Sequence, residues 1–279
     1  MGSLNISCAL WSLTKGPTDE ELEAALKTVA GIGIKAVQLW CVDDAKSNTF
    51  TVLDPDRCTG AKRMEWARRI RNDFGLEISG FCAQLTGKDE LGNFAGTDDL
   101  DERLRKTQES LRLAVDMESP IVTTHIGPVP EDRNSPVYKQ YVECVRQVAD
   151  VAEECGGIFA IEVGLESGEV LLGLIEDVGS PNVKVNFDPA NMLPYGTPEG
   201  VRLLKDHIVH SHAKDRHINR ATGKLASKDV PLGRGDVPWA QFFDAMAEIG
   251  YEGWYAIEDE SGDNIAESIK RGYEFLIQF

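Results

Sequence analysis

Four residues that can bind a metal ion end four successive apolar segments in the second half of the chain. They are Glu162 in FAIE, Asp188 in VNFD, His212 in VHSH and Glu258 in YAIE. Each segment has the length and composition of a buried strand, and a helical pattern follows it. If these strands lie parallel in a barrel, the four side chains meet at one mouth, although each alone could be an ordinary polar strand end. Three carboxylates and one imidazole favour Mn²⁺, Mg²⁺ or Co²⁺ over a structural zinc.

Two of the four residues, Glu162 and Glu258, could also move protons. A metal that chelates a carbonyl and a neighbouring hydroxyl acidifies the carbon between them. One glutamate could remove that proton and the other could return one. This is the chemistry of a ketose–aldose isomerase or a sugar epimerase, which proceeds through an enediolate. The alternative, in which both glutamates are ligands only and the base lies elsewhere, stays open.

Several other polar or aromatic residues lie near the expected strand ends and are candidates to bind a substrate. His125 ends the segment PIVTTH, Trp40 ends an earlier one, and Lys214 and Arg216 follow the expected histidine ligand. Each has an ordinary alternative: a strand cap for His125, core packing for Trp40, and surface ion pairs for the two cations. His210 lies one layer deeper than the expected ligand, so we expect a hydrogen-bonded core residue there.

A repeated phrase of amphipathic helix, glycine and short apolar strand organises the whole chain. AALKTVAGIGIKAVQLW and AMAEIGYEGWYAIE are two examples. Strands are expected near 5–10, 35–40, 76–82, 120–125, 158–162, 182–188, 207–212 and 253–258. Helices are expected near 19–31, 60–73, 99–117, 136–155, 168–178, 198–205, 238–249 and 264–277. Eight alternating units without a linker predict an α/β protein with one domain, a single (β/α)8 TIM barrel over residues 1–279.

The alternative architecture is an open, doubly wound sheet. Such a sheet would need a phosphate-binding glycine motif to hold a nucleotide, and the sequence contains no GxGxxG or Walker motif. The longest stretch without a helix or strand pattern, 213–237, is expected to be an irregular loop that closes over the pocket. The stretch 41–59 is a second candidate for the rim.

Composition restricts the partners and the compartment. The net charge of -17 argues against nucleic-acid binding, because a phosphate backbone would be repelled. Six cysteines without a CxxC motif are typical of reduced thiols, and no signal peptide is visible, so we expect a cytoplasmic protein. No apolar run approaches the length that spans a membrane.

These motifs resemble the xylose-isomerase-like TIM barrels, the sugar isomerase/epimerase superfamily, over essentially the whole chain. The firmest parts are AIEVGLESG, VKVNFDPANM, VHSHAKD, LGRGDVPW and GYEGWYAIEDE. The resemblance implies one divalent metal ion on Glu162, Asp188, His212 and Glu258. Mn²⁺ is the ion we expect, with Mg²⁺, Co²⁺ or Zn²⁺ as alternatives. It also implies a small sugar as substrate and, as in the ketose 3-epimerases, an acid/base role for the two glutamates.

The chain departs from two branches of this superfamily. Both the ketose 3-epimerases and the endonuclease-type enzymes carry a histidine three residues after the metal aspartate, where this chain has Asn191. The Asp-x-His pair of the endonuclease branch is also missing around 228–231. We therefore expect a metal-dependent isomerase or epimerase of a small sugar or keto-sugar. The alternatives are a dehydratase or lyase of a cyclic polyol or 3-keto-sugar, and a barrel that binds metal or sugar without catalysis. Homo-oligomerisation stays open.

Overall fold

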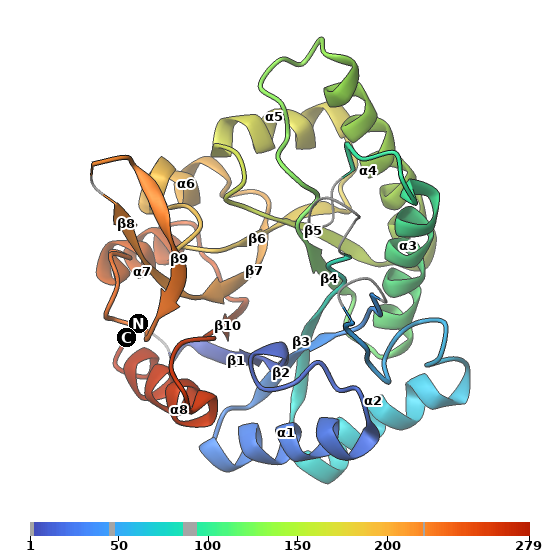
Figure 1. Cartoon of the computed structure of the whole chain (residues 1–279), viewed down its shortest axis with the longest axis vertical. Helices are drawn as coiled ribbons and strands as arrows, with labels where there is room; N and C mark the ends of the chain where they lie inside the picture. Colours follow the sequence, from blue (N-terminus) through green and yellow to red (C-terminus); the bar gives the residue numbers. More distant parts are fainter. Residues whose placement is uncertain (1–2, 45–47, 86–93, 220) are drawn as a thin grey trace.

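Eight parallel strands form a closed barrel at the centre of the protein (Figure 1). The computed structural model describes residues 3–44, 48–85, 94–219 and 221–279. The order around the barrel is β1-β10-β7-β6-β5-β4-β3-β2. The strands are β1 Asn5–Ala9, β2 Ala36–Trp40, β3 Glu77–Cys82, β4 Ile121–Thr124, β5 Ile158–Glu162, β6 Val183–Phe187, β7 Ile208–Ala213 and β10 Trp254–Ile257. This confirms the predicted (β/α)8 barrel.

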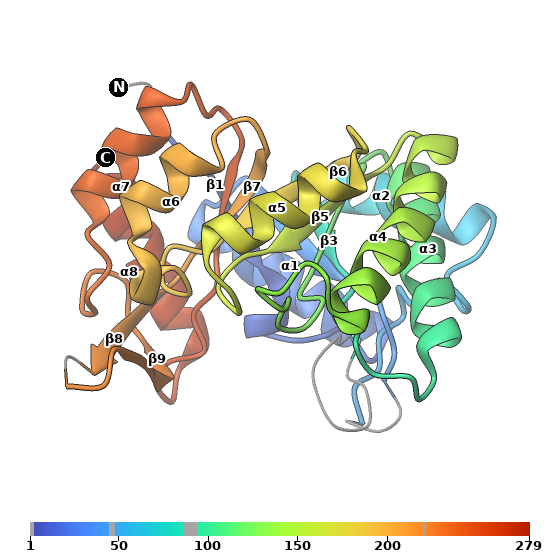
Figure 2. The ribbon, with the colours of Figure 1, turned by 90° about the horizontal axis from the view of Figure 1, so that it is seen from above.

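Helices cover the outside of the barrel, as both views show (Figures 1 and 2). They are α1 Asp19–Ile32, α2 Ala61–Phe74, α3 Leu100–Asp116, α4 Pro136–Cys155, α5 Gly168–Val178, α6 Thr197–Leu203, α7 Trp239–Glu248 and α8 Ile265–Leu276. Short 3-10 helices, η1 Leu10–Ser12 and η2 Leu193–Tyr195, follow β1 and β6. The side chains of Thr18 and Ser135 cap α1 and α4 by accepting hydrogen bonds from the backbone. Nowhere in the described chain is a helix long and apolar enough to cross a membrane.

The barrel strands are buried on both faces. All five residues of β2 are buried, and so are the last four of β5. The outer faces pack against the helices, for example where the ring of Phe187 stacks on that of Phe242 with centroids 5.9 Å apart. Because both faces are covered, the strands read as continuous apolar runs, and this is the pattern that located them in the sequence.

The stretch 213–237 differs from the irregular loop that we expected. β7 continues to Ala213, and an antiparallel hairpin follows, formed by β8 Asp215–Asn219 and β9 Lys224–Val230. It extends beyond one end of the barrel (Figure 2). The sequence did not predict these two strands because both are polar and neither carries the apolar face typical of a core strand. The other expected rim segment, 41–59, is described except for 45–47 and contains one antiparallel bridge between Asp44 and Thr49.

Candidate metal centre

The four expected metal ligands lie together at the carboxyl ends of β5, β6, β7 and β10. One donor atom from each of Glu162, Asp188, His212 and Glu258 lies within 4.8 Å of the other three. Nδ1 of His212 lies 3.3 Å from Glu162 Oε1, 3.9 Å from Asp188 Oδ2 and 3.0 Å from Glu258 Oε2. The side chains of Glu162, Asp188 and His212 are at most 4% exposed, and that of Glu258 is 11% exposed. The four side chains thus form a compact, largely buried cage in which carboxylate oxygens surround one ring nitrogen.

Asp188 gives a direct test of whether a cation fits this cage. Its Oδ1 accepts hydrogen bonds from the backbone nitrogens of Ala190, at 2.8 Å, and Asn191, at 3.0 Å. Its Oδ2 is buried and has no hydrogen-bond donor among the residues that the structure describes. A buried carboxylate oxygen without a partner is costly. A divalent cation held by all four side chains would supply the missing partner, and the donor set suits a hard ion such as Mn²⁺ or Mg²⁺.

The ring of His212 is held from below by Gln38. Gln38 Oε1 lies 3.1 Å from His212 Nε2, and Gln38 Nε2 donates to Thr123 Oγ1 at 2.9 Å. A histidine whose Nδ1 binds a cation carries its proton on Nε2, and the Gln38 oxygen is placed to accept a hydrogen bond from that N–H group. Gln38, in the middle of β2, therefore orients the nitrogen ligand towards the three carboxylates.

Charge in the cage is strongly perturbed. Burial opposes a charge on His212, but the carboxylates of Glu162 and Glu258 outweigh it and raise its pKa well above the usual range. Burial likewise opposes ionisation of Glu162, whose pKa is nevertheless held well below normal by His125 and His212. The pKa of Glu258 is lowered in the same way, against burial, by Lys214 and His212. Glu162 and Glu258 are thus ionised, and a bound cation would displace the proton from His212.

The two glutamates have different neighbours. Glu258 Oε1 accepts a hydrogen bond from Trp11 Nε1 at 3.2 Å, and its Oε2 lies 3.1 Å from Lys214 Nζ. Glu162 Oε1 instead lies 3.3 Å from His125 Nε2 and accepts from Asn191 Nδ2 at 3.3 Å. One carboxylate is therefore paired with a fixed cation, and the other with a titratable imidazole and an amide.

A glycine makes the contact between Asn191 and Glu162 feasible. Gly164 has a φ of +112°, and a Cβ at this position would lie 2.2 Å from Asn191 Cβ. Only a residue without a side chain allows the loop after β5 to approach the loop after β6 so closely. The motif AIEVG therefore combines the candidate ligand with the glycine that lets a neighbouring loop support it.

A cavity of 670 Å³ opens above the cage. The four expected substrate-binding residues, His125, Lys214, Arg216 and Trp40, all line it. Its wall also includes residues that the sequence did not single out as site residues, namely Lys15, Thr49, Cys82, Gln84, Gly164, Leu165, Asn191, Leu225 and Glu260. They come from segments far apart in the chain, so only the closure of the barrel brings them together.

Asp215, between the two candidate cations of the rim, does not bind the metal cage. It accepts hydrogen bonds from the backbone nitrogens of Gly233, Gly235 and Val237 and from Trp239 Nε1. These bonds tie the segment LGRGDVPW to the end of β7. Asp215 therefore fixes the base of the β8–β9 hairpin, and with it the two flanking cations.

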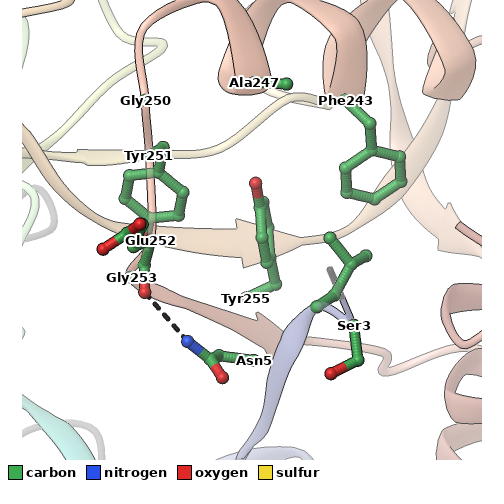
Figure 3. Close-up of a pocket in the computed structure, with 10 residues that line it drawn as sticks. Ser3, Asn5, Phe243, Ala247, Gly250, Tyr251, Glu252, Gly253 and Tyr255 are labelled. Atoms are coloured by element: carbon green, nitrogen blue, oxygen red, sulfur yellow. Dashed lines mark hydrogen bonds between the residues drawn. The ribbon is translucent and has the colours of Figure 1, made fainter. Parts of the chain in front are cut away.

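A second cavity, of 520 Å³, lies at the opposite end of the barrel, by the amino ends of β1 and β10 (Figure 3). The rings of Tyr251, Tyr255 and Phe243 surround it, and Asn5 Nδ2 donates to the backbone oxygen of Glu252 at 2.9 Å. In barrels of this type the chemistry takes place at the carboxyl ends of the strands. The candidate active site is therefore the cavity above the cage.

Comparison with known proteins agrees with this geometry. Residues 26–279 match the sequence family described as xylose isomerase-like TIM barrel. A D-psicose 3-epimerase from Ruminiclostridium cellulolyticum is 31% identical over 144 residues, which are 48% of this chain and 45% of that enzyme. The chain spans less than two thirds of the length of the first curated relatives that it matches.

Two solved structures share the fold. A xylose isomerase domain protein from Planctomyces limnophilus superimposes with a TM-score of 0.79 at 23% identity, covering 99% of this chain and 96% of that one. A xylose isomerase-like TIM barrel protein from Mycobacterium smegmatis, solved in complex with magnesium, has a TM-score of 0.72 at 19% identity, with coverages of 99% and 96%.

Proposed function

This chain belongs to the xylose isomerase-like TIM barrel family, and we propose that it is a divalent-metal-dependent isomerase or epimerase of a small sugar or keto-sugar. The observation that carries the proposal is the position of Glu162 and Glu258. Both contribute to one cage that fits a cation, and both line the same cavity. The D-psicose 3-epimerase relative supports a sugar as the substrate.

The proposed ligands of the cation are Glu162, Asp188, His212 and Glu258. A bound divalent cation would acidify the carbon between a chelated carbonyl and its neighbouring hydroxyl. Mn²⁺ is the proposed ion from the donor set, and Mg²⁺, present in the Mycobacterium smegmatis structure, is the main alternative.

The two glutamates are the proposed acid/base pair. In the barrel, β6 and β7 separate β5 from β10, so Glu162 and Glu258 reach the cavity from different sides. One carboxylate would take the proton from the substrate carbon to give an enediolate, and the other, after gaining a proton from solvent, would return one. Return to the opposite face of the same carbon gives an epimer, and return to the adjacent carbon gives the isomeric aldose or ketose.

The remaining wall would bind and orient the sugar. The rings of Trp11 and Trp40 meet edge to face with centroids 6.1 Å apart, and we propose that Trp40 packs against the apolar face of the substrate. His125, Lys214 and Arg216 offer polar groups to its oxygens. The proposed location is the cytoplasm, because all six cysteines are free and five of them are buried.

Hydrogen exchange from solvent tests the proposal. The Mn²⁺-loaded protein is incubated in D₂O with a panel of ketopentoses and ketohexoses, their phosphates and the corresponding keto-sugar acids, and the products are followed by NMR. Deuterium at a carbon beside the carbonyl, without loss of water, is the expected result, and the carbon that is labelled separates epimerase from isomerase. The protein with both Glu162→Gln and Glu258→Gln is the control and should show no exchange. Loss of water would make the protein a lyase, and absence of exchange with every sugar would contradict the proposal.

A further inference from the structure

We infer that the substrate carries an anionic group, a carboxylate or a phosphate, and that Arg216 and Lys15 bind this group at the rim of the cavity. The inference rests on the proposed function because it concerns the same cavity. It adds the chemical class of the substrate, which neither the cage nor the two glutamates specify.

The guanidinium of Arg216 is fixed at one side and free at the other. Its Nε donates to Asp229 Oδ1 at 2.6 Å, and the side chain of Asp229 is 7% exposed, so the pair is well anchored. Its two Nη groups donate no hydrogen bond to any residue in the described ranges. Arg216 lines the cavity. A guanidinium anchored in this way presents a fork whose spacing matches the two oxygens of a carboxylate or phosphate.

Another arginine of the same chain shows what a purely structural guanidinium looks like. Arg105, on α3, places Nε, Nη1 and Nη2 on the carboxylates of Glu102 and Asp56. Every nitrogen of that guanidinium has an acceptor at 2.7 to 2.9 Å. Arg216 has one anchoring acceptor and leaves both Nη groups for something else in the cavity.

Lys15 reaches the same cavity from the loop after β1. Its Nζ lies 4.0 Å from the centre of the Trp40 ring, and Trp40 Nε1 donates to the backbone oxygen of Val42 at 2.6 Å. The ring thus positions the ammonium without using any of its N–H groups. The described part of the chain offers Lys15 no hydrogen-bond acceptor, whereas Lys214 is already paired with Glu258.

Arg216 and Lys15 lie on one side of the cavity. Arg216 follows β7 and Lys15 follows β1, and only β10 separates these strands in the barrel. Of the acidic residues of this rim, Glu260 is exposed to solvent and Asp229 is paired with Arg216. The guanidinium of Arg216 and the ammonium of Lys15 therefore face the same part of the cavity, where both can donate hydrogen bonds to one anionic group of a substrate.

Binding of three polyols that cannot react tests this inference. D-Glucitol, D-gluconate and D-glucitol 6-phosphate share one carbon chain and differ in their terminal group. Their affinities for the Mg²⁺-loaded protein are measured by calorimetry. We expect at least one anion to bind about ten-fold tighter than glucitol or better, the scale of one charge-assisted contact. The better of the two anions identifies the group as a carboxylate or a phosphate.

Two variants locate the bound anion. Arg216→Gln and Lys15→Met remove the charge and keep an unbranched stem, and each should reduce the preference for the anion several-fold. The control is Arg271→Gln on α8, where the side chain is 68% exposed, and it should keep the preference. Equal affinity for the three polyols, or no binding of any of them, would overturn the inference. If the doubly substituted protein still binds the anion more tightly than glucitol, the inference is also overturned, because the anion would then bind the metal ion and not Arg216 and Lys15.

The outcome does not depend on turnover. If no sugar exchanges hydrogen with solvent but the anion preference is present and is lost in the variants, the proposed reaction fails and the anion site stands. If exchange occurs and the preference is absent, the reaction stands and the inferred substrate class fails.

Discussion

Substitution of Asp188 by asparagine should abolish the stabilisation that a divalent cation gives to this protein. Asparagine keeps an oxygen in place of Oδ1, which accepts from the backbone nitrogens of Ala190 and Asn191. It replaces Oδ2, the buried oxygen without a donor among the described residues, with an amide nitrogen that cannot bind a cation. The substitution therefore removes the ligand and preserves the local hydrogen bonds.

The size of the effect follows from linkage. A ligand at a hundred times its Kd stabilises the folded state by about 2.7 kcal/mol. For 279 residues the entropy of unfolding is about 0.6 kcal/mol per kelvin, so the melting temperature should rise by about 4 to 5 °C. Loss of a ligand should weaken binding by at least about 100-fold, since groups that only support a ligand already account for 10- to 100-fold. At the same cation concentration the shift then falls to less than about 1 °C.

Differential scanning calorimetry of the EDTA-treated protein, with and without added Mn²⁺, measures both shifts. Asp244→Asn, an exposed substitution on α7 that changes the net charge by the same amount, is the matched control and should keep the full shift. A wild-type shift in Asp188→Asn would place the cation outside the cage. Absence of a shift in the wild type would show that the cage binds no divalent cation at all.

Two further predictions concern carboxylates of the same region. Glu258→Gln and Glu162→Gln should each lower kcat by about 10²-fold or more, the usual loss when a general acid or base is removed. Calorimetry should still detect bound Mn²⁺ in both variants. Near wild-type turnover in a metal-loaded variant would exclude that glutamate as an acid or base. Burial raises the pKa of Glu166 to about 7. The buried neutral carboxyl group therefore contributes its full stability below the unfolded pKa of 4.5, and this contribution is lost as the pH rises through 7. Glu166→Gln should therefore have wild-type stability near pH 4 and be more stable than the wild type by up to about 3 kcal/mol above pH 7. Urea unfolding at the two pH values measures the difference in stability between variant and wild type, and an equal difference at both would contradict the prediction.

The barrel could be predicted because its strands and helices carry local signals that agree with the global fold. The strand that begins at Ile158 is a short apolar run, because helices cover one face and the barrel interior the other. Glycines in the left-handed region, such as Gly75 and Gly156, mark the helix ends at which the chain turns into the next strand. Repetition of these signals identified eight units, and eight units of this kind close into a barrel.

The β8–β9 hairpin could not be predicted in the same way. Its strands, DRHIN and KLASKDV, are held by each other and by the four hydrogen bonds of Asp215, and they pack no continuous apolar face onto the core. Pairing of two polar strands depends on where β7 ends and on how the segment LGRGDVPW returns, and both are properties of the folded barrel. The sequence indicated a functional rim element but not its structure.

The supporting residues of the site were missed for a related reason. Gln38 lies on β2 and contacts His212 across the barrel, 174 residues away in the chain. In the sequence Lys15 cannot be told from any other loop lysine, and only the fold places its ammonium over the Trp40 ring. Residues at strand ends can be located in the sequence because the apolar strands that carry them are recognisable. Residues that act across the barrel have no such signal, because strand order and register set their partners.

The two histidines of VHSHA show how depth in the barrel separates residues that look equivalent in the sequence. His210, one layer below the cage, has no exposed surface and pairs through Nδ1 with Asn186 Oδ1 at 2.9 Å. Burial, together with the nearby His212, lowers its pKa to about 3 and keeps it neutral, while the carboxylates raise the pKa of His212. A charged His210 would repel a cation held directly above it, so a neutral polar layer below the cage favours cation binding. Depth along the strand sets which histidine meets the carboxylates; burial keeps His210 neutral, and the carboxylates favour a proton on His212 when no cation is bound.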